Sequence, residues 1–172
     1  MAVQDIVNSG WSPSQGHPST PSVKVRTPLL SEVFKKVNNA KTKPQKIKVL
    51  KDNDSPALRA ICKWSFDPNI LSAVPEGVPP YIPNDAPEGT EHARLSTEHS
   101  KLYYYIKGGH DKIQSVKRES MFVQLLEALH PSEAEVLLHA KDKQLHKIYK
   151  GLSDAVVKES FNWGDNYQIK NV

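Results

Sequence analysis

Cysteine and long apolar runs are the two things this chain most conspicuously lacks. Cys62 is the only cysteine in 172 residues, which excludes an internal disulfide and any zinc site built from cysteines. A reducing cytoplasm fits this usage. No apolar stretch approaches the roughly 20 residues that a membrane-spanning helix needs. The first residues have no basic flank followed by an apolar core, so we expect no signal peptide and no membrane partner.

Recognisable catalytic and cofactor motifs are missing as well. The sequence has no glycine-rich phosphate loop, no Gly-x-Ser-x-Gly elbow and no His-Glu-x-x-His pair. Glu127 and His130 form one Glu-x-x-His, but a di-iron site needs a second such pair and two further glutamates on other helices. Two pairs of histidines recur seven residues apart, which is two helical turns and too far for one ion. We therefore expect a non-enzymatic protein without metal or cofactor.

Proline, by contrast, is abundant. The chain has 13 prolines and only 38% hydrophobic residues, which is below the usual apolar content of globular proteins. The apolar deficit is concentrated at the N-terminus and in one central loop, and the remainder is ordinary globular sequence. A chain of this length suits a single domain with a substantial core.

Helix start signals are clear in the first half of the chain. Each signal is a capping residue, or a proline suited to the first helical turn, that stands before an apolar run. The three signals are Thr27-Pro28, Pro44 and Ser55-Pro56. Asp67-Pro68 ends the third of these helices. Cys62 lies on the apolar stripe of that helix, which indicates a small core residue rather than a nucleophile.

The second half continues the pattern. A helix is expected from about Glu91 to Lys107, where Gly108-Gly109 stops it. Asp111 is suited to cap the next helix, His130-Pro131 breaks that helix before another begins, and Ser153 is suited to cap the last. Short connections imply antiparallel neighbours. We predict an all-α fold, either a compact multi-helix bundle or an orthogonal helical array.

These signals divide the chain into parts. Residues 1–26 are rich in Ser, Pro, Gly and Gln and are expected to form a flexible polar arm, in which Trp11 is either a docking anchor or an incidental aromatic. Residues 27–161 are expected to form a single helical domain, in which 67–90 is a long proline-rich loop. Residues 162–172 are expected to form a frayed C-terminal tail.

Positive charge is distributed unevenly. The net charge of the chain is +4, yet nine basic residues lie between Lys24 and Lys51 against Glu32 alone. Such asymmetry favours an anionic partner, although a solvated lysine face that only keeps the domain in solution is the plainer interpretation. The candidate residues for binding nucleic acid or a protein partner are Lys35, Lys36, Lys41, Lys43, Lys46, Lys48 and Lys51.

The proline-rich loop is a second candidate for binding a partner. Extended Pro-Pro-Tyr segments suit aromatic grooves, and this one comprises Pro79, Pro80 and Tyr81. The loop is also apolar enough to pack across the domain, which we favour.

Three consecutive tyrosines form a third feature. Because Tyr103, Tyr104 and Tyr105 point around a helix, at least one must face solvent, where it could stack on single-stranded nucleic acid. We favour two rings in the core and one at its rim. A helix-turn-helix over 111–143 is disfavoured, since Glu133 and Glu135 open its second helix where phosphates would lie.

Long blocks of the sequence resemble a known family. These are AKTKPQKIKVLKDNDSPALRAICKWSFDPNI, VPEGVPPYIPND, YYYIKGG, VKRESMFVQLLEALHPSEAEVLLHAKDKQL and YKGLSDAVVKESF. Together, over about residues 29–161, they resemble an uncharacterised protein family of T4-like tailed bacteriophages, notably marine and cyanobacterial ones. The resemblance brings no activity and no site residues. It implies a phage gene product that acts in the cytoplasm of the infected host or is carried in the virion.

Two functions remain open at this point. One is an interaction module that binds nucleic acid, or a phage or host replication or transcription protein, through the basic segment. The other is a minor virion component whose N-terminal arm becomes ordered on assembly.

Overall fold

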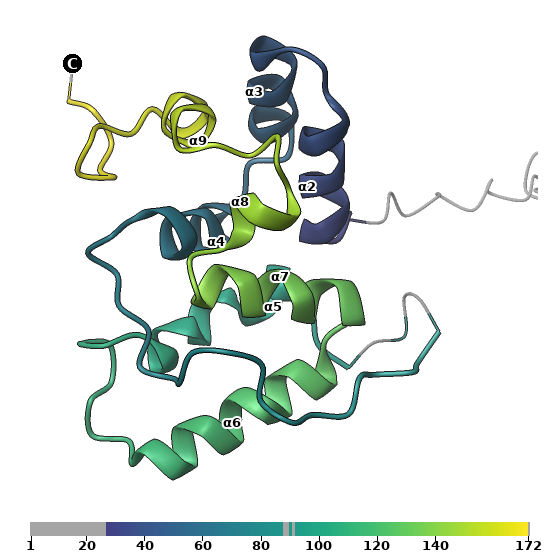
Figure 1. Ribbon diagram of the computed structural model, residues 1–172, viewed down its shortest axis with the longest axis vertical. Coiled ribbons are helices and arrows are strands. Elements are labelled where there is room, and N and C mark those ends of the chain that lie inside the picture. Colours follow the sequence, from purple (N-terminus) through teal and green to yellow (C-terminus); the bar gives the residue numbers. More distant parts are fainter. Residues whose placement is uncertain (1–26, 88–89, 91, 172) are drawn as a thin grey trace, which may run out of the picture.

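A computed structural model describes residues 27–87, 90 and 92–171 (Figure 1). Every regular element in these ranges is helical, so the predicted all-α class is confirmed. None of the helices in the described part is long and apolar enough to span a bilayer. The elements are α2 Leu30–Asn39, α3 Lys43–Asp52, α4 Pro56–Phe66, α5 Leu95–Glu98, the 3-10 helix η2 His99–Tyr105, α6 Ser115–Ala128, α7 Pro131–Lys141, α8 Leu145–Ile148 and α9 Asp154–Phe161.

Three of these helices, α3, α4 and α9, begin where Pro44, Ser55-Pro56 and Ser153 predicted. The side chain of Thr42 accepts a hydrogen bond from the third residue of α3, and Pro44 lies in its first turn. Ser55 caps α4 in the same way, and Ser153 caps α9. Each side chain satisfies a backbone N–H that has no partner within its own helix.

The first predicted boundary is wrong by two residues. α2 begins at Leu30 rather than directly after Thr27, because the N–H of Leu29 donates to the carboxylate of Glu32 at 2.8 Å and closes the helix start there. The arm over residues 1–26, with Trp11, Lys24 and Arg26, lies outside the described residues.

The helix expected over 91–107 is also corrected. α5 is a single turn, and η2 continues it with the tighter 3-10 geometry to Tyr105. Ala93 donates its N–H to the carbonyl of Ala128, which holds the chain before Leu95 in an extended bridge and delays the helix start. A backbone turn then follows, with Gly108 at φ +84° as the glycine signal predicted.

Asp111 does not cap the next helix. Its carboxylate accepts the N–H of Gly108 at 2.9 Å and so closes the preceding turn, and α6 begins only at Ser115. The break at His130-Pro131 is confirmed, with His130 at the N-cap of α7.

α7 occupies the centre of the molecule. It packs against α2, α4, α6 and α8, while the antiparallel pair α2 and α3 packs on α9 through α3 (Figure 1). The core includes the fully buried Phe34, Trp64, Leu126 and Leu137. Cys62 is fully buried, and burial raises the pKa of its thiol, so the core interpretation is confirmed.

The expectation of a frayed tail is wrong for residues 162–171. Trp163 and Tyr167 are buried, and the ring of Trp163 lies 4.8 Å from that of Phe161. Asn162 adopts a left-handed conformation at φ 55°, which turns the chain back, and Trp163 then pairs with Ile169. Aromatic burial therefore fixes this segment against α9.

Candidate functional site

Among the described residues, no three His, Cys, Asp or Glu side chains lie together as metal ligands would. The Glu-x-x-His pair also has other partners. Glu127 accepts the N–H of Ile82 at 3.0 Å, and Nδ1 of His130 lies 2.7 Å from the hydroxyl of Ser132. The remaining candidates are two surfaces, one basic and one rich in proline.

The first surface is formed by α2, α3 and their connection, which we term the basic hairpin. Six of its seven candidate lysines are exposed, and Lys46 is half-buried. Two of the seven form ion pairs: Lys43 with Glu159 at 2.7 Å and Lys48 with Asp52 at 2.9 Å. The other five form no ion pair with a described residue, and they are Lys35, Lys36, Lys41, Lys46 and Lys51.

The lysines of α3 surround the helix rather than forming one stripe. Ile47 and Leu50 are buried and define its inner side. At 100° per residue, Lys48 points away from that side, while Lys46 and Lys51 flank it. The hairpin thus presents positive charge in several directions, which suits a partner that wraps around it or a diffuse phosphate surface.

Positive charge extends from the hairpin to the C-terminal segment. The hydrogen-bonded ion pair with Lys43 lowers the pKa of Glu159, and the charges of Lys51 and Lys170 lower it further. Glu159 is therefore one carboxylate among three lysines drawn from two distant parts of the chain.

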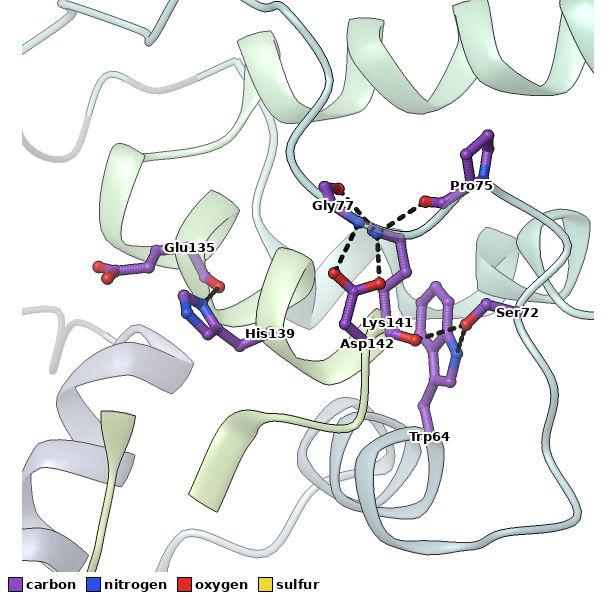
Figure 2. Close-up of polar contacts among 8 residues, drawn as sticks. All are labelled: Trp64, Ser72, Pro75, Gly77, Glu135, His139, Lys141 and Asp142. Atoms are coloured by element: carbon purple, nitrogen blue, oxygen red, sulfur yellow. Dashed lines mark hydrogen bonds and ion pairs between the residues drawn. The ribbon is translucent and has the colours of Figure 1, made fainter. Parts of the chain in front are cut away.

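The second surface depends on a lysine that the sequence did not single out. The side chain of Lys141 is completely buried, and its ammonium donates to the carbonyls of Pro75 and Gly77, each at 2.9 Å (Figure 2). Asp142 lies 2.6 Å from the same ammonium and accepts the N–H of Gly77 at 3.0 Å. The end of α7 thereby holds the loop by three hydrogen bonds, and the ion pair of Lys141 with Asp142 joins the two residues that make them.

A second anchor lies beside the first. The indole N–H of Trp64 donates to the hydroxyl of Ser72 at 2.9 Å, and that hydroxyl donates to the carbonyl of Lys141 at 2.6 Å (Figure 2). One signal in the sequence could have indicated this role: Lys141 lies seven residues after Ala134, on the same helix face as the buried Leu137 and Leu138.

The expected packing of the proline-rich loop is confirmed only in part. Val74 is buried, and Tyr81 is half-buried, where desolvation raises the pKa of its phenol. Val78 and Ile82 are 70% and 77% exposed. Of the candidate triplet, Pro79 is half-buried and Pro80 exposed. The triplet thus lies at the surface, beyond the part of the loop that Lys141 anchors.

The tyrosine cluster matches the favoured arrangement only in part, because one ring rather than two is fully in the core. Tyr105 is buried against Phe122, Tyr104 is half-buried, and Tyr103 is 43% exposed. The rings of Tyr103 and Tyr104 stack with centroids 4.3 Å apart. His110 lies beside both rings and extends the cluster.

Comparison with known proteins gives one match. No curated protein and no solved structure matches this chain. A sequence profile described as "Family of unknown function (DUF6433)" matches residues 33–147, which include most of the helical core, the proline-rich loop and Lys141. The expected membership of an uncharacterised family is therefore confirmed, and the chain belongs to the family DUF6433.

Proposed function

We propose that this protein is a non-enzymatic interaction module that binds the phosphate backbone of nucleic acid through the basic hairpin. The observation that carries the proposal is the set of five lysines in α2, α3 and their connection that pair with no described carboxylate. Lysines without internal partners keep their charge available for phosphates, whose bound counterions they displace.

We further propose a biological setting on the resemblance of its sequence blocks. The chain is the product of a T4-like tailed phage and acts in the cytoplasm of the infected bacterium. The lysine-dominated surface supports backbone contact rather than the reading of base sequence, since arginine is the commoner residue in specific base contacts.

The test is a titration of nuclease-treated protein with fluorescent single- and double-stranded oligonucleotides at several salt concentrations. The logarithm of the binding constant should fall linearly with the logarithm of salt. Replacing four exposed lysines of the hairpin, K35Q/K36Q/K41Q/K51Q, should weaken binding to the duplex and reduce the slope by up to about 3.6, since each phosphate contact contributes about 0.9.

The matched control changes the same number of exposed lysines elsewhere. K107Q/K112Q/K117Q/K147Q lowers net charge equally and leaves the hairpin intact. It should bind nearly as tightly as the unaltered protein. Equal losses in both variants would show that only net charge matters, and a larger loss in the control would place binding near Tyr103. Binding to neither oligonucleotide at low salt would rule out nucleic acid as the partner.

A further inference from the structure

An apolar groove lies between the proline-rich loop and α6. Its volume is about 300 Å³, and its apolar lining includes Val74, Phe122 and Val123. We term it the proline groove. Val116, which is 77% exposed, precedes Val123 by two helical turns on the same face of α6, so the apolar surface continues beyond the groove.

The groove is preformed. Its loop side is held at one end by the buried ammonium of Lys141 on the carbonyls of Pro75 and Gly77, and at the other by the N–H of Ile82, which donates to Glu127 of α6. Its helix side is the regular backbone of α6. A segment that enters it does not have to order the loop first, which lowers the entropic penalty of binding.

The negative charge at the rim of the groove favours an occupant that carries a positive charge. The two charged residues that line it, Glu76 and Glu119, are both exposed carboxylates. An apolar lining with an acidic rim fits an aliphatic side chain that has a lysine or arginine beside it.

The C-terminal segment presents such a pair at the other end of the molecule. Ile169 is 59% exposed, and Lys170 follows it. The N–H of Lys170 donates to the carbonyl of Asn162 at 2.9 Å, which fixes the turn that presents both side chains. The nearby acidic residue Asp165 is paired with Lys158 at 3.3 Å. Figure 1 shows this segment and α6 at opposite ends of the molecule.

We propose that the proline groove binds the Ile169-Lys170 segment of a second copy of this chain. Ile169 enters against Phe122 and Val123, and Lys170 lies beside Glu119. The segment that inserts and the groove that receives it are different surfaces at opposite ends of one molecule. The contact is therefore head-to-tail, and it adds copies in a row instead of closing a two-fold dimer.

The test is sedimentation velocity of nuclease-treated protein from micromolar to near-millimolar concentration. The unaltered chain should form a concentration-dependent series of species larger than a dimer. Ile169→Asp disables the inserting segment, and Glu119→Lys disables the groove. Each variant alone should be monomeric, with association weakened roughly 30-fold or more, because an unpaired charge would enter the apolar groove or two lysines would face each other.

Mixing the two variants gives the decisive result. Ile169→Asp retains its groove and Glu119→Lys retains its C-terminal segment, so the mixture should form a one-to-one dimer and nothing larger. The reciprocal change Glu119→Lys/Lys170→Glu in one chain should restore the series. A chain that stays monomeric throughout, variants that still associate, or a mixture without dimer would each overturn the proposal. Circular dichroism serves as the control that both surface variants are folded.

Discussion

At the scale of single residues, the stability of the fold depends on close backbone contacts and buried polar groups more than on the surface lysines. Gly151 follows α8, and its N–H donates to the side chain of Asn38 at 3.0 Å. A β-carbon at this position would lie 2.9 Å from both the Cα of Asn38 and the carbonyl oxygen of Val37. The end of α2 and the chain before α9 can approach this closely only because residue 151 has no side chain.

Gly151→Ala should therefore destabilise the fold by about 1–3 kcal/mol, since two backbone segments must separate. Chemical denaturation measures this free energy of unfolding. Gly164→Ala is the matched control, because its nearest contact is a side-chain atom of Asn166 at 3.3 Å, which can move. Equal losses for the two variants would contradict the argument from close approach.

Lys141→Met removes the buried ammonium while nearly keeping the length of the side chain. Two loop carbonyls and Asp142 would lose their donor, so the free energy of unfolding should fall by about 3 kcal/mol. Hydrogen exchange at Gly77, whose N–H is bonded to Asp142, should also become faster. Lys147→Met, at an exposed position, should change neither quantity measurably.

Two buried tyrosines predict how the fold responds to alkali. Burial raises the pKa of Tyr105 and of Tyr149 to about 12, above the ordinary value of 10.0. Their contribution to stability is complete below pH 10.0 and is lost as the pH rises through the folded values near 12. Phenolate absorbance should therefore show a late, cooperative rise that coincides with loss of helical circular dichroism. Phenolate formation by all six tyrosines near pH 10.0 in the intact fold would contradict this.

At the scale of elements, α7 joins parts of the chain that are far apart in sequence. Glu133 lies in its first turn and is 1% exposed. Its carboxylate accepts the N–H of Leu30 and that of Leu95, each at 3.0 Å, so that one side chain caps the first residues of α2 and α5. The same residue had counted only as evidence against a helix-turn-helix, because periodicity says nothing of a contact 103 residues away.

Glu133→Gln should destabilise the protein by about 2 kcal/mol. The amide has one acceptor oxygen where the carboxylate has two, and its NH₂ group would face a backbone donor. Thermal and chemical denaturation both measure this effect, and Glu135→Gln, two residues on at an exposed position, serves as the control. A Glu133→Gln variant with the same free energy of unfolding as the unaltered protein would mean that the starts of α2 and α5 do not depend on this carboxylate.

At the scale of the whole molecule, sequence periodicity was enough for the class of fold, while prolines and capping residues located the starts of α3, α4, α7 and α9. Local signals with a side-chain cap, such as Ser55 and Ser153, were reliable because their partner lies three residues away. Two errors arose where contacts outside the local helix pattern decide the structure: the bridge from Ala93 to the end of α6, and Trp163 packing on Phe161. The starts of α2 and α6 were misplaced for a local reason, because Glu32 bonds Leu29 and Asp111 bonds Gly108. The lysines of the basic hairpin were identified from composition alone, whereas the proline groove depends on Lys141, whose burial only the tertiary structure reveals.

The charge of the molecule is also organised at this scale. The basic hairpin and Lys170 lie toward one end, and the acidic rim of the proline groove lies by α6 toward the other (Figure 1). In the proposed head-to-tail contact, the Ile169-Lys170 segment at the basic end would meet the acidic groove of the next copy, and the lysines of the basic hairpin itself would stay available for phosphate.

The most direct test of the central claim is a map of backbone amide chemical shifts during titration with a short DNA duplex. The shifts should be concentrated in residues 35–51 and should be reversed by added salt, because contacts of lysine with phosphate are electrostatic. Shifts concentrated around Tyr103 and His110, or no shifts at low salt, would contradict the proposed role of the basic hairpin.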